Sequence, residues 1–175
     1  MQNFNIRPAI EQDFPAIFDL IKGLAAFQKT PEKVFNTVEQ MKAEQAYFEC
    51  FVAENEAKEI VGIAVYSFVY STWVGKSIYL DDLYVLETYR GHKIGSQLLK
   101  ALFEVAKKES CKRVRWLVSH WNTPALEFYQ KIGAKIYKEE WICDFDREAI
   151  LKKIAETKTF FGIGEHYLER VMKRI

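Results

Sequence analysis

DDLYVLETYRGHKIGS, residues 81–96, joins a predicted strand at 78–85 to a predicted amphipathic helix at about 94–109. The loop between them contains two glycines. The N–H groups at the start of a helix have no partners within it, and the helix dipole adds positive charge there. The loop is therefore a candidate phosphate site, to which Arg90 and Lys93 would add charge. An ordinary strand-to-helix turn is the alternative, because short glycine motifs often match by chance.

The rest of the chain predicts one α/β domain with a mixed, mostly antiparallel central sheet flanked by helices. Alternation of apolar and polar residues predicts further strands at 4–7, 48–53, 60–69, 113–119 and 136–145. Helical spacing and capping signals predict further helices at 11–27, from 37, from 124 and at 146–158. The domain is expected to cover residues 1–175, with a helical extension over 157–175.

Composition excludes several classes of function. The chain has 25 basic and 24 acidic side chains, and this balance argues against a nucleic-acid binder. No apolar run reaches the roughly 18 residues of a membrane span, and residues 1–8 contain no apolar run long enough for a signal peptide. A cytoplasmic protein without a membrane partner is therefore expected. The cysteines Cys50, Cys111 and Cys143 are predicted to be buried or half-buried free thiols. No metal is expected, because histidine and cysteine lack the spacing of ligands.

Two segments resemble a known superfamily. Residues 90–95, RGHKIG, resemble the R/Q-x-x-G-x-G/A loop that binds coenzyme A (CoA) pyrophosphate in GNAT acetyltransferases. Residues 121–134, WNTPALEFYQKIGA, resemble that superfamily's W-N-x-x-A-x-x-F-Y-x-x-x-G-A signature. Residues 6–9, 20–22, 51–54, 73–76 and 78–82 also resemble the spermidine/spermine (diamine) N-acetyltransferases, and this resemblance extends to about residue 155. The resemblance implies the GNAT fold and an N-acetyltransferase that uses acetyl-CoA.

The resemblance also implies a donor site. The strand residues Leu83, Tyr84 and Val85 would pair with the pantetheine arm, and a bulge there would free an N–H for the thioester carbonyl. Asn122 and Ala125 match positions near the pantetheine. Lys93 replaces the middle glycine of the loop. The residues expected to contact the pyrophosphate are Arg90, Gly91, His92, Lys93, Ile94, Gly95 and Ser96.

The resemblance assigns catalytic roles to a tyrosine and a carboxylate. Tyr129 matches the general acid that protonates the leaving thiolate, whereas the residue pattern alone indicates a core tyrosine. Asp81 and Asp82 match acidic residues at the end of the strand, with Asp81 as the predicted catalytic carboxylate and both as binders of the cationic amine. Whether a carboxylate is a base or only an electrostatic binder stays open. Adjacent strand residues face opposite ways, so only one is expected to face a given cleft.

The acceptor implied by the resemblance is the primary amine of a polyamine or diamine, acetylated by direct transfer. Phe27 and Gln28 stand where the family's polyamine site has an aromatic–glutamate pair, and Glu139 and Glu140 match an acidic stretch near that site. The missing glutamate favours a smaller amine, such as thialysine or lysine, as the alternative. A CoA-binding module without catalysis is a further alternative. Family members are typically homodimers, so the expected partners are acetyl-CoA, a small amine and a second copy.

Overall fold

The structure is a computed structural model that describes residues 3–161, and the side chains of residues 3–156. It divides into two compact units, with the boundary after Glu127. The single domain expected from the sequence stays a prediction. Within the described residues, no helix is long and apolar enough to span a bilayer.

The first unit contains a five-stranded sheet in the order β1-β2-β3-β4-β5. All neighbouring strands are antiparallel except β4 and β5, which are parallel, so the predicted mixed sheet is confirmed. The strands are β1 (Asn5–Pro8), β2 (Glu49–Glu54), β3 (Ile60–Ser71), β4 (Gly75–Val85) and β5 (Val114–Arg115). The α-helices are α1 (Phe14–Phe27), α2 (Val38–Ala43), α3 (Ile94–Lys108), α4 (Thr123–Lys131), which crosses the boundary, and α5 (Arg147–Phe161) of the second unit. Short 3-10 turns lie at η1 (Glu11–Asp13), η2 (Pro31–Lys33), η3 (Gln45–Tyr47) and η4 (Glu87–Tyr89).

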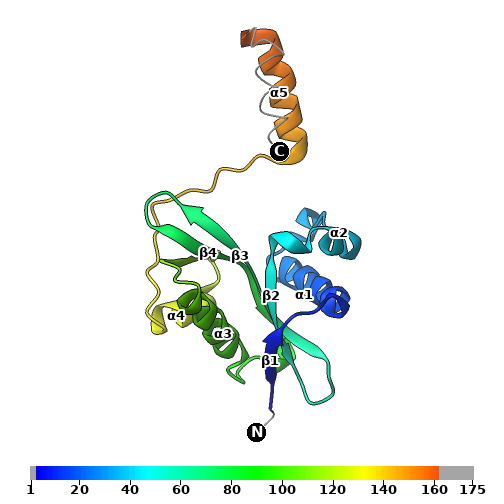
Figure 1. The fold of residues 1–175 in the computed structure, drawn as a ribbon, viewed down its shortest axis with the longest axis vertical. Helices are drawn as coiled ribbons and strands as arrows, with labels where there is room; N and C mark the ends of the chain where they lie inside the picture. Colours follow the sequence, from blue (N-terminus) through cyan, green and yellow to red (C-terminus); the bar gives the residue numbers. More distant parts are fainter. Residues whose placement is uncertain (1–2, 162–175) are drawn as a thin grey trace. The chain divides into compact units, whose positions relative to one another are not determined.

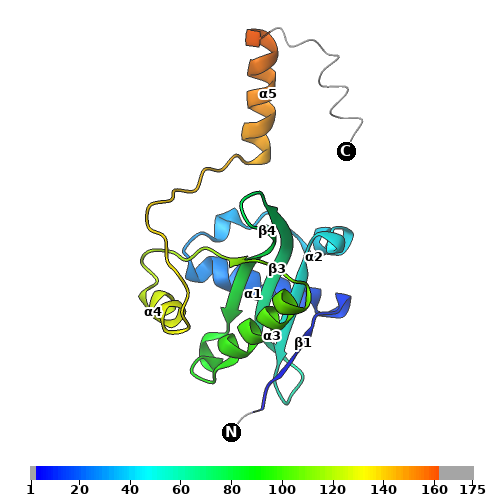
Figure 2. The same cartoon turned by 60° about the vertical axis from the view of Figure 1, so that its left-hand side comes forward.

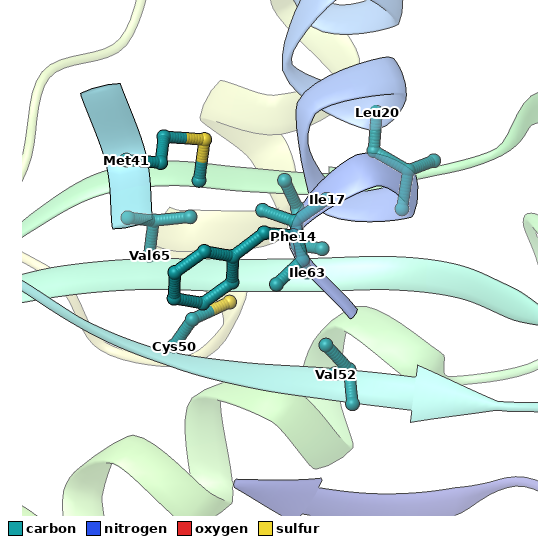
Figure 3. Packing of buried hydrophobic residues seen from close by; sticks show 8 residues of the cluster. All are labelled: Phe14, Ile17, Leu20, Met41, Cys50, Val52, Ile63 and Val65. Atoms are coloured by element: carbon teal, nitrogen blue, oxygen red, sulfur yellow. The ribbon is translucent and has the colours of Figure 1, made fainter. Parts of the chain in front are cut away.

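Helices cover both faces of the sheet. In Figures 1 and 2, α1 and α2 lie on one face and α3 lies on the other. The α1 side is filled by apolar side chains from two helices and two strands (Figure 3). These are Phe14, Ile17, Leu20, Met41, Cys50, Val52, Ile63 and Val65. The Thr37 hydroxyl accepts a hydrogen bond from the Gln40 N–H at 3.1 Å, which confirms the predicted cap of α2.

Helix α3 covers the opposite face of the sheet. Its buried residues are Ile94, Leu98, Leu99, Leu102 and Ala106. A Cβ at Gly62 of β3 would lie 3.2 Å from Cγ2 of Ile94 and 3.3 Å from the carbonyl oxygen of Tyr84. A Cβ at this position would crowd both atoms, so the glycine favours the close approach of the start of α3 to the strand that leads into the loop.

One predicted strand is wrong and another is shorter than predicted. Residues 136–145 form no strand, because an alternating pattern becomes a strand only where another strand supplies hydrogen bonds, and no described residue pairs with this segment. Residues 113–119 form only β5. The predicted helix at 146–158 is confirmed as α5, whose last residues overlap the predicted extension. The remainder of that extension, residues 162–175, lies outside the described residues.

All three cysteines are free, as predicted. Cys50 is buried and Cys111 is half-buried, but Cys143 is exposed and that part of the prediction is wrong. Cys143 belongs to the segment that lacks the predicted strand, so no sheet neighbour covers its thiol.

An ionic network fixes the entry to α1. The Arg7 guanidinium donates to both carboxylate oxygens of Asp13, at 2.6 and 2.9 Å, and to Glu54 at 3.0 Å. The Asp13 carboxylate also accepts the Ile10 N–H at 2.9 Å. These hydrogen bonds hold the pKa of Asp13 below its usual value near 3.8, and the bond from Arg7 has the largest effect. The ionised carboxylate therefore ties β1 and β2 to the start of the helix.

We expect Asp13→Asn to lower the free energy of unfolding at pH 7 by about 2 kcal/mol, because Asn cannot form the paired ionic bonds. A depressed pKa contributes stability above the unfolded pKa and loses it as the pH falls through the folded pKa. The gap between wild type and variant should therefore close below about pH 4. Urea denaturation at pH 7 and pH 3 measures it. A gap of equal size at both pH values would contradict the ionic account.

Candidate active site

A β-bulge interrupts β4 at the carboxylate pair. Val65 of β3 pairs with Asp82, whereas the next residue, Tyr66, pairs with Leu80, which leaves Asp81 as the extra residue. From Leu83 onward the ladder with β3 is regular. The bulge expected within residues 83–85 therefore lies two residues earlier, at Asp81, where β4 has one residue more than β3 between the pairs formed by Val65 and Tyr66.

Asp82 faces the α1 side of the sheet. It pairs with Val65, whose side chain belongs to the core under α1, and directly paired residues share a face. Asp82 is half-buried, and this burial, with a smaller contribution from the charge of Asp81, raises its pKa to about 7. A carboxyl group with a pKa near neutrality suits a general base better than one with an ordinary pKa.

Asp81 lies close enough to Asp82 for the two charges to interact. Partial burial raises the pKa of Asp81, and the pKa of Tyr79 is raised by burial and then by both carboxylates. The expectation that the two residues point to opposite sides assumed a regular strand, and the bulge removes that regularity. The two carboxylates therefore lie together at the bulge, and the role of Asp81 as the catalytic carboxylate stays a prediction.

The loop before α3 has the geometry of an anion site. Gly91 has φ 84°, and Lys93, at the N-cap position of α3, is left-handed with φ 62°. Ile94 is buried and anchors the turn, so only its backbone is available to a ligand. A Cβ at Gly91 or Gly95 would have no neighbour within 4 Å, so open space lies beside the first turn. The residues present fit a phosphate group there.

The other predicted pyrophosphate residues differ in their contacts and exposure. The Nδ1 atom of His92 lies 3.2 Å from the carbonyl oxygen of Tyr89 and 3.1 Å from that of Arg90, so one edge of its ring faces the backbone. Ser96 is exposed in the first turn of α3. The Nε atom of Arg90 donates to the carbonyl oxygen of Val85 at 3.3 Å.

Arg90 also contacts aromatic residues of α1 and β4. Its guanidinium lies over the Phe27 ring at 5.0 Å and over the Tyr84 ring at 5.8 Å. The Phe27 ring is 5.6 Å from that of Trp121. We call Phe27, Tyr84, Arg90 and Trp121 the Phe27 cluster. The cluster connects Phe27, which is predicted to bind the amine, with Arg90, which is predicted to bind acetyl-CoA.

Sequence reasoning missed Gly23 and the contact of Trp121. A Cβ at Gly23 of α1 would lie 3.2 Å from Cε1 and 3.3 Å from the hydroxyl of Tyr84, so glycine allows the close approach of helix and strand. No local signal marks that glycine, because its neighbour is distant in sequence. Trp121 belongs to the quoted WN signature, which was the available signal.

Asn122 and Ala125 are joined by a hydrogen bond at the start of α4. The Asn122 side-chain oxygen accepts the Ala125 N–H at 3.4 Å, and its carbonyl oxygen accepts the Leu126 N–H at 3.0 Å. Asn122 therefore caps α4. Gln28 follows the last residue of α1 and is exposed, and its N–H bonds to the carbonyl oxygen of Leu24 at 2.8 Å.

Tyr129 belongs to the second unit. It is buried on α4, and this burial raises its pKa to about 12. Its carbonyl oxygen accepts the Ala134 N–H at 3.0 Å after Gly133, with φ 86°, ends the helix as predicted. Glu139 and Glu140 are exposed in the segment that forms no strand.

No group of three or more His, Cys, Asp or Glu side chains able to hold a metal ion occurs in the part of the chain that the structure describes. The absence of a metal in the reaction stays a prediction.

Three comparisons relate the chain to known proteins. The profile of the family described as "Acetyltransferase (GNAT) family" matches residues 13–134. The chain is 35% identical to a thialysine N-epsilon-acetyltransferase of Mus musculus, over 86% of this chain and 96% of the relative. It is 34% identical to the spermidine/spermine N(1)-acetyltransferase-like protein 1 of Homo sapiens, over 86% of this chain but 24% of that longer protein. An aminoglycoside N-acetyltransferase in complex with CoA has a similar fold, with TM-score 0.66 and 18% identity over 84% of this chain and 97% of the other.

Proposed function

The chain belongs to the GNAT family of N-acetyltransferases, and from this premise we propose that it acetylates the side-chain amine of thialysine or a similarly small amine. The donor is acetyl-CoA. The observation that carries the choice of acceptor is Gln28, which offers no carboxylate beside Phe27. A long polycation would need an anionic partner at this position for its second ammonium group.

The donor binds to the loop before α3 in this proposal. The free N–H groups of the first turn of α3 bind the pyrophosphate, and the left-handed residues Gly91 and Lys93 aim the loop backbone at the same space. The edge of β4 at Leu83–Val85 stays the predicted partner of the pantetheine arm. The bulge at Asp81 supplies an irregular backbone next to that edge.

Asp82 is the proposed general base. An acceptor ammonium must lose a proton before its nitrogen attacks the thioester carbon, and the ionised Asp82 carboxylate takes that proton directly or through water. The new N–C bond forms as the C–S bond breaks, and the displaced thiolate finally receives a proton, so no external reactant is needed. Asp81 adds negative charge that attracts the ammonium.

Tyr129 is the proposed hydrogen-bond donor to the departing thiolate. With a pKa of about 12, the phenol keeps its proton throughout the neutral range. Complete transfer to a thiolate would be uphill, because a cysteine thiol, taken as a stand-in for the CoA thiol, has a pKa of about 8.5. The phenol therefore stabilises the charge that develops on sulfur. The CoA thiolate then receives a proton that the amine has released. The role of Tyr129 in this reaction stays a prediction.

Polyamine acetylation is the second candidate. It is supported by the human relative named after spermidine/spermine acetylation and by the pair Asp81 and Asp82, which suits a cation. The two candidates differ in what they need at position 28.

We expect wild-type enzyme to prefer thialysine to spermidine, and Gln28→Glu to raise kcat/KM for spermidine by about fivefold, the value of one partly exposed ion pair. Thialysine turnover should change less. Gln28→Ala, which removes the amide without adding charge, is the matched control and should not gain spermidine activity. Release of the CoA thiol measures all three proteins. Equal spermidine turnover in wild type and Gln28→Glu would show that this position does not set specificity.

A further inference from the structure

The bulge at Asp81 also decides which way Tyr79 of β4 faces. Tyr79 pairs with Ser67 of β3. Asp82 pairs with Val65, two residues before Ser67 on the same strand. Residues two apart on a strand share a face, and directly paired residues share it too, so Tyr79 lies on the α1 face with Asp82. Residues three apart on a regular strand would face opposite ways, and the extra residue Asp81 is what brings the two together.

Tyr79 and Asp82 are neighbours on that face. Their partners on β3 are two residues apart, which is about 7 Å along a strand. The charges of the carboxylate pair also reach the phenol. Burial has the largest effect in raising the pKa of Tyr79, and the charges of Asp81 and Asp82 raise it further. The hydroxyl therefore keeps its proton at neutral pH and lies in the electric field of the two carboxylates.

The fold makes no use of the Tyr79 hydroxyl. The side chain is half-buried, and none of the residues whose side chains are described forms a hydrogen bond with it. Its neighbours across the sheet are Ser67 of β3 and Arg115 of β5. A tyrosine that is partly buried usually has a partner for its hydroxyl. The hydroxyl is therefore available to a ligand that reaches the carboxylate pair.

An acceptor ammonium group has three N–H donors and needs more than one partner. Asp82 accepts one of them before it removes the proton. A phenol oxygen can accept another while its own proton points to a carboxylate, so Tyr79 suits the second bond. We propose that Tyr79 is a further acceptor-binding residue, whose hydroxyl oxygen accepts a hydrogen bond from the ammonium group that Asp82 deprotonates. This inference rests on the proposed function.

Nuclear magnetic resonance of protein labelled with carbon-13 at the tyrosine Cζ tests the placement of Tyr79 without any acceptor. The Tyr79 signal, identified by its loss in Tyr79→Phe, should shift with a midpoint near pH 7, because burial raises the pKa of Asp82 to about 7. Asp82→Asn should remove this shift. Tyr70, which is 78% exposed near the end of β3, is the internal control and should not respond to Asp82. A Tyr79 signal that follows pH equally in wild type and Asp82→Asn would overturn the proposal.

Steady-state kinetics test the contact with the amine. Tyr79→Phe keeps the ring but loses a hydrogen bond to a charged group, so kcat/KM for thialysine should fall about tenfold. The loss should appear in the KM of the amine rather than in kcat, because the bond already forms in the ground-state complex. CoA affinity, measured by calorimetric titration, should stay at the wild-type value. Tyr70→Phe is the matched control and should behave as wild type does.

Thermal unfolding verifies that each variant is folded. Loss of CoA affinity together with amine affinity in Tyr79→Phe would indicate a structural role and overturn the proposal. An unchanged KM for the amine in active Tyr79→Phe would overturn the contact and leave the proposed function intact. If folded wild type binds CoA but turns over no amine, the proposed function and the contact fail together.

Discussion

Replacement of Asp82 by asparagine is expected to lower kcat/KM at pH 8 by about 10²-fold or more, the usual contribution of a general base. In wild type, kcat/KM should fall below about pH 7, because the Asp82 carboxyl, with its pKa raised to about 7 mainly by burial, becomes protonated there. Asp82→Asn should lose this acidic limb. A pH–rate profile of each enzyme measures it.

The same substitution should stabilise the fold. A carboxyl whose pKa is raised on folding weakens the folded state as the pH rises from the unfolded pKa, near 3.8, to the folded pKa, and the cost is complete above about pH 7. The variant avoids that cost, so its advantage in urea denaturation should be largest at pH 8 and should vanish near pH 4. Lost activity together with gained stability would separate a catalytic carboxylate from a structural one.

Asp81→Asn is the matched control for Asp82. The charge of Asp81 contributes to the raised pKa of Asp82, so its removal should shift the acidic limb of the profile to lower pH and leave most of the activity. A larger loss of kcat/KM in Asp81→Asn than in Asp82→Asn would restore Asp81 as the base.

Tyr129→Phe is expected to lower kcat by about 10²-fold, because phenylalanine keeps the ring but cannot donate a hydrogen bond to the thiolate. CoA affinity should stay within about twofold of wild type, since the lost bond strengthens only as charge develops on sulfur. Steady-state kinetics and calorimetric titration with CoA measure the two quantities. Full activity in Tyr129→Phe would return Tyr129 to the role of a core residue.

Local patterns predicted the elements that local chemistry determines. Thr37 and Gln40 marked the cap of α2, and Gly133 marked the end of α4. The spacing of residues 90–95 marked the loop, and the left-handed φ of Lys93 agrees with its place at a position where the motif has glycine.

Features that depend on distant partners could not be predicted in this way. The bulge at Asp81 depends on how β4 pairs with Val65 and Tyr66 of β3, which no pattern within β4 records. The alternation in residues 136–145 resembles a strand, but no described residue pairs with it. The contact of Arg90 with Phe27 joins residues far apart in sequence, because α1 packs beside β4 and β4 leads into the loop that contains Arg90.

The most direct test measures the release of CoA from acetyl-CoA by wild-type protein through thiol detection. The acceptors offered are thialysine, lysine, spermidine, spermine and putrescine, with a blank that contains no amine. Mass spectrometry of the products identifies the acetylated nitrogen. The account predicts that thialysine or lysine is turned over best and gives one CoA for each N-acetylated product. A clear preference for a polyamine would contradict the proposed acceptor, and no turnover above the blank by folded protein that binds CoA would contradict acetyl transfer to these small amines.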